Sequence, residues 1–233
     1  MDPVAHPAPS TRLRDLLQLA VGYLLILAVI WSPRATQRPL YILAVLFLVA
    51  ATWVSFDGWA SMGLRRTNFL RSLWLPAIAL VIASLAVVAA IRYQTLHPVG
   101  GFTRYLKSFW GYAIWSFAQQ WLLQAFFLLR LLRILPGKPY AAVVAASIFA
   151  LAHLPNPILT AATLIWGLIA CLVFLRYRNL YTLAITHAVL GICLAICVPG
   201  PVIRNMRVGL GYLTYPRHHL ADLSVYQFDF RRS

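Results

Sequence analysis

Glutamine side chains inside apolar stretches are the first residues of this chain that could do chemistry. Ser116, Gln120 and Gln124 are spaced i, i+4 and i+8, so on a helix they form one stripe. Gln119 flanks the stripe, about 100° round the helix from Gln120. Amide groups that face lipid are costly, so the stripe must face other helices or water. It either links helices by hydrogen bonds or lines a polar pocket.

Two histidines lie in two later apolar stretches. His153 shares a helix face with Phe149, and His187 shares one with Gly191. Two imidazoles can relay protons, bond to carbonyl groups or contribute to a metal site. A metal ion needs three or four ligands, and these spans offer two imidazoles and no carboxylate, so we expect no metal and no cofactor. With the glutamine stripe, the histidines predict one pocket shared by three spans.

The composition places these residues in a membrane. Of the 233 residues, 61% are hydrophobic and 11% are charged, whereas soluble domains carry about 25% charged residues. A soluble core of this length could not hide so much apolar side chain, and a disordered chain would have far less of it. The acidic residues are all aspartates, and none lies inside an apolar run. They are Asp2, Asp15, Asp57, Asp222 and Asp229. This pattern excludes a carboxylate pair buried in the membrane.

The chain is a basic protein, with 20 Lys and Arg residues and a formal charge of +15. These residues lie between the apolar runs, as in the loops of membrane proteins, so we expect them to meet anionic lipid headgroups and not nucleic acid. Three cysteines lie within apolar runs. An odd, buried set does not indicate a disulfide framework, and we interpret Cys171, Cys193 and Cys197 as small packing residues.

Seven apolar runs have about the length that crosses a bilayer. They predict an all-α, polytopic membrane helix bundle with seven transmembrane spans, and two prolines at Pro155 and Pro157 predict a tight hairpin between the fifth and sixth. We divide the chain into a flexible N-terminus (1–15), an integral membrane domain (16–198) and a basic, aromatic C-terminal tail (199–233). The runs are Leu16–Trp31, Leu40–Phe56, Leu73–Ile91, Phe109–Leu129, Tyr140–Leu154, Ile158–Leu175 and Leu180–Val198.

The polar residues also carry a resemblance. Between Ser108 and Val198 the chain resembles the CPBP family of intramembrane proteins, the CAAX prenyl endopeptidase and bacteriocin-processing group, also called Abi. Three family motifs match in order. E-E-x-x-x-R is matched from Gln119 to Gln124, F-x-x-x-H from Phe149 to His153, and H-x-x-x-N from His187 to Gly191. The resemblance implies an integral membrane protein, which we expect in the bacterial inner membrane.

The departures from the motifs concern the chemistry. In the family the glutamates are taken to activate a water, and the histidines and asparagine to bind it and stabilise the developing oxyanion. A glutamine can orient a water but cannot take its proton. The arginine position is also neutral, at Gln124, as if the charged set had been removed together. The resemblance and these departures imply a pseudoenzyme, whose neutral pocket binds a lipid, an isoprenoid or a peptide segment.

Two other readings stay open. The chain could be an active membrane enzyme that uses His153 and His187 as acid and base on a hydrophobic or prenylated substrate. It could also be an accessory subunit of a larger membrane complex that docks through its tail. The tail is equally explained as an aromatic and basic anchor at the membrane interface, with Tyr212, Tyr215, Tyr226, Phe228 and Phe230 among arginines.

Overall fold

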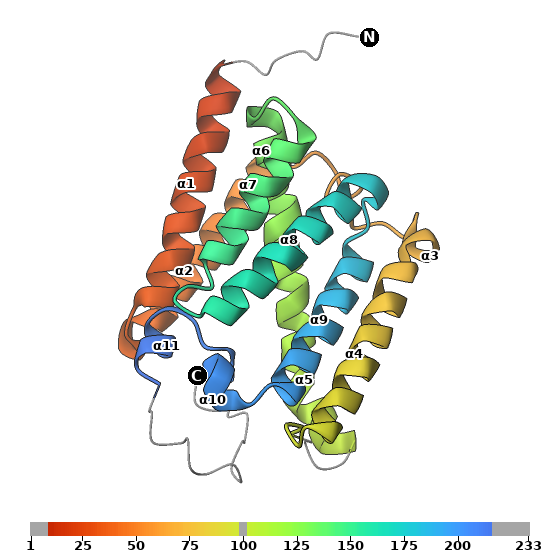
Figure 1. Cartoon of the computed structure of the whole chain (residues 1–233). Helices are drawn as coiled ribbons and strands as arrows, with labels where there is room; N and C mark the ends of the chain where they lie inside the picture. Colours follow the sequence, from red (N-terminus) through yellow and green to blue (C-terminus); the bar gives the residue numbers. More distant parts are fainter. Residues whose placement is uncertain (1–8, 98–101, 216–233) are drawn as a thin grey trace.

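The computed structural model describes residues 9–97 and 102–215, and every regular element in these ranges is a helix. The long helices form one bundle (Figure 1). They are α1 (Pro9–Trp31), α2 (Arg34–Val54), α4 (Trp74–Arg92), α5 (Phe102–Trp121), α7 (Lys138–Leu151), α8 (Pro157–Tyr177) and α9 (Leu180–Cys197). The short ones are α3 (Phe69–Ser72), the π-helix η1 (Leu122–Leu128), α6 (Leu129–Ile134), α10 (Gly200–Ile203), the 3₁₀ turn η2 (Arg204–Met206) and α11 (Gly209–Leu213).

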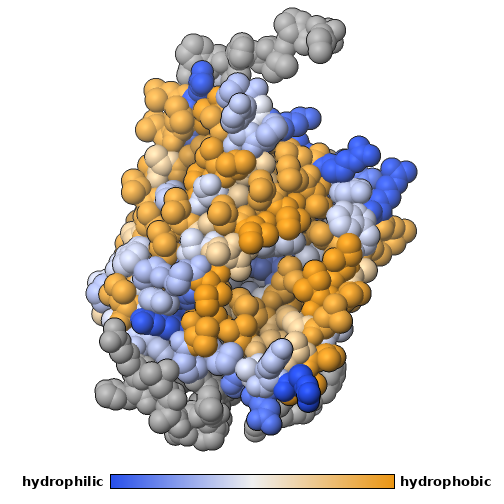
Figure 2. All heavy atoms as spheres, in the orientation of Figure 1, coloured by the Kyte–Doolittle hydropathy of each residue, from blue (hydrophilic) through white to orange (hydrophobic). Residues whose placement is uncertain are grey.

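All seven predicted apolar runs are helical, which confirms a polytopic helical bundle. Five helical segments are long and apolar enough to cross a membrane: Thr11–Trp31, Arg34–Val54, Phe69–Arg92, Pro157–Tyr177 and Leu180–Cys197. The fifth predicted run forms the shorter apolar helix α7. The fourth is divided between α5 and η1. Large apolar side chains stay exposed on the outer faces, as on α4, where Leu85 is 65% exposed. Figure 2 shows this apolar surface over most of the visible face.

The N-terminal boundary differs from the expectation. Helix α1 begins at Pro9, so residues 9–15, which we had placed in a flexible segment, are helical. Asp15 is therefore part of a candidate span and is fully buried. Its carboxylate accepts two hydrogen bonds from Arg133 on α6, at 2.7 and 3.0 Å, and Arg133 also reaches Asp57 at 3.2 Å. Burial of Asp15 is possible because this arginine pairs its charge.

The π-helix η1 lies at the centre of the bundle. Its residues Leu123, Phe126 and Leu128 are completely buried, and η1 packs against α2, α5, α6, α7 and α8. Beside it, α7 and α8 approach closely. A β-carbon on Gly167 would lie only 3.3 Å from the backbone of Ala146. Small residues permit this packing. It fixes the two helices that bracket the predicted proline hairpin.

One asparagine starts each of the last two long helices. Asn156 accepts a hydrogen bond from the backbone N–H of Leu159 at the start of α8, and Asn179 does the same for Thr182 in α9. These are ordinary N-caps. Each asparagine also uses its amide N–H groups to hold a neighbouring loop, so each cap links a helix start to another part of the chain.

Candidate functional site

The predicted glutamines lie where an α-helix changes into a π-helix. Gln119 and Gln120 are in the last turn of α5, and Gln124 is in η1. A π-helical turn inserts an extra residue into the helix and is often found at functional sites. Here it begins at Leu122, between the two halves of the predicted stripe. Ser116, Gln120 and Gln124 are all completely buried, as a polar stripe between helices requires.

A neutral hydrogen-bonded chain connects the glutamines to one histidine. Gln124 Nε2 donates to Gln120 Oε1 at 3.3 Å, and Gln120 Nε2 lies 3.0 Å from His187 Nδ1. Since the oxygen of Gln120 already accepts, its amide nitrogen donates, and His187 Nδ1 is the acceptor. This network assigns the proton of the neutral imidazole to Nε2. The three motif residues therefore form a chain without any formal charge.

Aromatic rings enclose His187. The rings of Trp166, Phe149 and Tyr112 have their centres 6.0, 6.1 and 6.5 Å from that of the imidazole. The side chain is only 6% exposed. These apolar walls disfavour the charged imidazolium, which agrees with the neutral chain behind it.

His153 carries its proton on the other ring nitrogen. Its Nδ1 lies 2.8 Å from the carbonyl oxygen of Phe149, and its ring packs edge-on against the Phe149 ring at 5.0 Å. A carbonyl can only accept, so Nδ1 carries the proton and Nε2 of the neutral ring is left as an acceptor. One histidine thus offers an acceptor nitrogen and the other an N–H donor, and Phe149 contacts both rings.

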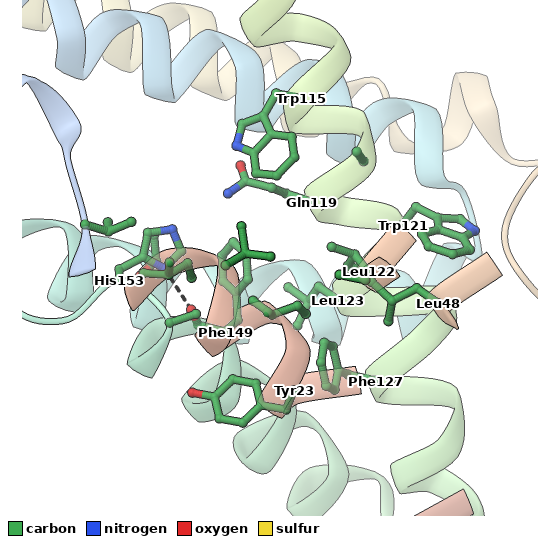
Figure 3. A pocket seen from close by; sticks show the side chains of 18 of the residues that line it. Tyr23, Leu48, Trp115, Gln119, Trp121, Leu122, Leu123, Phe127, Phe149 and His153 are labelled. Atoms are coloured by element: carbon green, nitrogen blue, oxygen red, sulfur yellow. Dashed lines mark hydrogen bonds between the residues drawn. The ribbon is translucent and has the colours of Figure 1, made fainter. Parts of the chain in front are cut away.

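A cavity of about 480 Å³ adjoins these histidines. Helices α1, α2 and α5 and the π-helix η1 provide most of its walls. The end of α7 and the turn after it, α8, α9 and the segment after α10 provide the remainder. Gln119 and His153 both project into it, as Figure 3 shows. None of the lining residues in the described part of the chain carries a formal charge. Its polar lining residues are Tyr23, Tyr41, Tyr112, Trp115, Gln119, Trp121, His153, Thr163 and His187.

The predicted residues divide into two sets. Gln119, Phe149, His153 and His187 line the cavity, whereas Ser116, Gln120, Gln124 and Gly191 do not. The stripe itself therefore links helices, and the flanking Gln119 faces the open space. Of the three spans expected to be neighbours, α5 packs along α9 and η1 packs against α7. Between α7 and α9 the ring contact of Phe149 with His187 makes the connection.

Tyr112 is a cavity residue that the motifs did not predict. Its hydroxyl and ring lie directly against Gly191, in the space that a β-carbon there would need. The only hint in the sequence is the glycine in the third motif, which implies that another group fills the place of the missing asparagine side chain. Nothing in the spacing identifies that group, because Tyr112 is on α5 and far away in sequence.

The first part of the tail is also docked onto the bundle. Asn156 Nδ2 donates to the carbonyl oxygens of Ile203 and Arg207, at 2.8 and 3.1 Å. The N–H of Gly209 donates to the carbonyl oxygen of Leu154 at 2.8 Å. These contacts place Met206 and Val208 in the cavity wall. The remaining tail aromatics Tyr226, Phe228 and Phe230 lie outside the described residues.

Comparison with known proteins agrees with the resemblance. Residues 102–193 match the model of a family described as type II CAAX prenyl endopeptidase Rce1-like. The matched segment runs from α5 into α9 and includes all three motif positions. No curated protein and no solved structure gives a significant match. The family match confirms the predicted resemblance, and the apolar helices agree with an integral membrane protein.

Proposed function

We propose that this membrane protein, similar over residues 102–193 to the type II CAAX prenyl endopeptidases, binds an uncharged lipid or isoprenoid in its cavity and does not cleave peptides. The observation that carries the proposal is the neutral pair at the motif glutamates. Gln119 faces the cavity, and Gln120 is bonded to His187 behind it. Neither amide can remove a proton from a water.

The hydrogen-bond chain supports loss of the proteolytic chemistry. Water attack on a peptide bond needs a general base within hydrogen-bond reach. Both polar atoms of Gln120 are engaged, one with Gln124 and one with His187. Among residues 9–97 and 102–215, no carboxylate lines the cavity. The site can orient a polar group but does not offer the family's base.

The lining indicates the chemical class of the ligand. Its walls are mainly aliphatic and aromatic, and its volume falls within the range of about 300–1,000 Å³ for small-molecule sites. The polar groups are neutral: the Tyr112 hydroxyl, the Gln119 amide and the two histidines. A charged headgroup would lose its hydration without gaining a counter-charge. We therefore expect a long apolar chain with an uncharged polar end, such as an isoprenoid alcohol.

A matched pair of ligands tests this proposal. Farnesol and farnesyl diphosphate share one apolar chain and differ in the charge of the head. We expect farnesol to raise the melting midpoint of the purified protein in detergent, and farnesyl diphosphate to leave it unchanged. Stronger stabilisation by the diphosphate would contradict an uncharged ligand.

Two variants of one helix provide the control. Ala118 lines the cavity, whereas Ala113 on the same helix is exposed on the outer face. Ala118→Phe should abolish the farnesol shift by filling the cavity, and Ala113→Phe should keep it. An equal loss in both variants would place the binding outside the cavity.

A second candidate function is histidine-based catalysis. The observation that favours it is the free acceptor Nε2 of His153, which the bond to Phe149 leaves unprotonated. This nitrogen could serve as a base toward a membrane-borne substrate. Cleavage of a prenylated peptide by the purified protein that is lost in His153→Ala would support this alternative and displace the first proposal.

A further inference from the structure

Five arginines lie at one end of the bundle, in the last turn and C-cap of α8, on the loop before α3 and in α3, which packs against α8 and α9. We call this group the arginine corner: Arg65, Arg66, Arg71, Arg176 and Arg178. Asn179 holds the loop in place by donating to the carbonyl oxygens of Arg65 and Thr67, at 3.0 and 3.4 Å. The N–H of Leu180 donates to Gly63 O at 3.0 Å. The fold thus brings together arginines that are far apart in sequence.

The sequence around the arginine corner contains almost no acidic residues. Between Asp57 and Asp222 the sequence contains no acidic residue. Asp57 forms an ion pair with Arg133 on α6, and Arg133 also pairs with Asp15. Within the described ranges, no member of the corner takes part in an ion pair. The described part of the chain therefore gives these arginines no counter-charge.

One guanidinium group of the corner is held by the fold, and a second has an unpaired nitrogen. Arg178 Nη1 donates to the carbonyl oxygen of Ser61 at 3.1 Å, and its guanidinium lies 5.3 Å from the centre of the Phe174 ring. Burial and the positive charge of Arg65 lower the pKa of Arg178. Arg65 Nε is buried and has no hydrogen-bond partner among the described residues. A buried, unsatisfied donor beside a second cation is a position where an anion would be stabilised.

Aromatic residues set the depth of the corner in the membrane. Trp74 Nε1 donates to the hydroxyl of Tyr177 at 3.3 Å, and Trp59 on the loop is 59% exposed. Tryptophan and tyrosine concentrate at the level of the lipid headgroups. Leu70, next to Arg71 in α3, is 79% exposed and suited to contact lipid. Figure 2 shows hydrophilic residues at this end, next to the apolar outer surface.

We propose that the arginine corner binds the phosphate of an anionic phospholipid, such as phosphatidylglycerol. The unsatisfied Nε of Arg65 and the fixed Arg178 receive the phosphate oxygens, and Arg66 and Arg71 add attraction at the surface. The exposed Leu70 and the tryptophans contact the acyl chains of the same lipid. Basic pockets at the ends of membrane helices bind anionic headgroups in this way.

The test compares lipids on the purified full chain in detergent. Phosphatidylglycerol should raise the melting midpoint and stay bound in native mass spectrometry, whereas phosphatidylcholine of the same acyl chains should do neither. Arg65→Gln combined with Arg66→Gln should weaken the apparent affinity about fivefold for each arginine. Arg65→Lys, which keeps the charge, should retain part of the effect.

The matched control removes two arginines from the other end of the bundle. Arg34→Gln with Arg38→Gln lowers the net charge equally and should leave phosphatidylglycerol binding unchanged. An equal loss in both double variants would overturn the proposal, because binding would then follow net charge. Inorganic phosphate that reproduces the full stabilisation would also overturn it. If the Arg65 variant does not fold, equal retention of the two lipids by the wild-type chain would be the contradicting result.

Discussion

The hydroxyl of Tyr112 occupies the space that a β-carbon on residue 191 would need. The glycine in the third motif is therefore a requirement of packing, and the asparagine of the family motif does not fit beside this tyrosine. Tyr112 also packs edge-on against His187, the residue that accepts from Gln120. Gln120, His187, Tyr112 and Gly191 thus form one connected set of contacts.

Replacement of Gly191 tests this relationship. Gly191→Ala forces the Tyr112 ring away from α9, and overpacking of this kind costs about 1–3 kcal/mol. We expect a clear drop in the melting midpoint in detergent. Gly111→Ala on α5 is the control, because nothing lies within 4 Å of a β-carbon there. The control should be neutral or stabilising by up to about 1 kcal/mol. Equal midpoints for the two variants would refute the tight contact.

Restoring the motif acids should harm the protein. A carboxylate near the bilayer centre costs about 3 kcal/mol. Gln120 is completely buried, whereas Gln119 lines the cavity, so Gln120→Glu should lower the melting midpoint more than Gln119→Glu. The double variant should be less stable than wild type at neutral pH. Addition of Gln124→Arg should rescue it in part by supplying the missing positive charge.

An unchanged stability of the Gln119→Glu, Gln120→Glu double variant would contradict this prediction. A double variant as stable as wild type would mean that water reaches both positions and solvates the charges. The proposal of a neutral, non-hydrolytic site would then be wrong, and a hydrolytic function would have to be considered again.

Asn156 should control the wall of the cavity formed by the tail. Asn156→Asp keeps the oxygen that caps α8 but loses both N–H donors to Ile203 and Arg207. Losing such buried bonds costs about 1–3 kcal/mol. We expect faster proteolysis within residues 199–215. Asn179→Asp is the control, because it should loosen the loop near Arg65 and leave the tail protected. Unchanged tail cleavage in Asn156→Asp would argue against the anchor.

The sequence was sufficient for the helical bundle because bilayer-length apolar runs have few alternatives. The glutamine stripe and the two histidines predicted one pocket shared by three spans, and Gln119, His153 and His187 line one cavity in the structure. The periodicity predicted that the stripe is buried. The periodicity did not reveal that Gln119, and not Gln120, faces the cavity. The stripe could either link helices or line a pocket, and the π-helix is not visible in the apolar pattern.

Other features depend on contacts between distant segments. Tyr112 has no motif, and its role follows only from the packing of α5 against α9. Asp15 was placed just outside the first apolar run, and its burial depends on Arg133, which is 118 residues away. The docking of the tail depends on Asn156, which the sequence shows only as a residue between two prolines. Local periodicity does not encode such partners.

The cleavage of a prenylated CAAX peptide by the purified wild-type chain, followed by mass spectrometry, tests the central claim most directly. An active protease of the family should be the positive control, and His153→Ala the matched variant. The neutral site predicts that the peptide stays intact at every time point in both forms of this chain. A shortened product from the wild type that disappears in His153→Ala would contradict the account and establish His153 as the catalytic base.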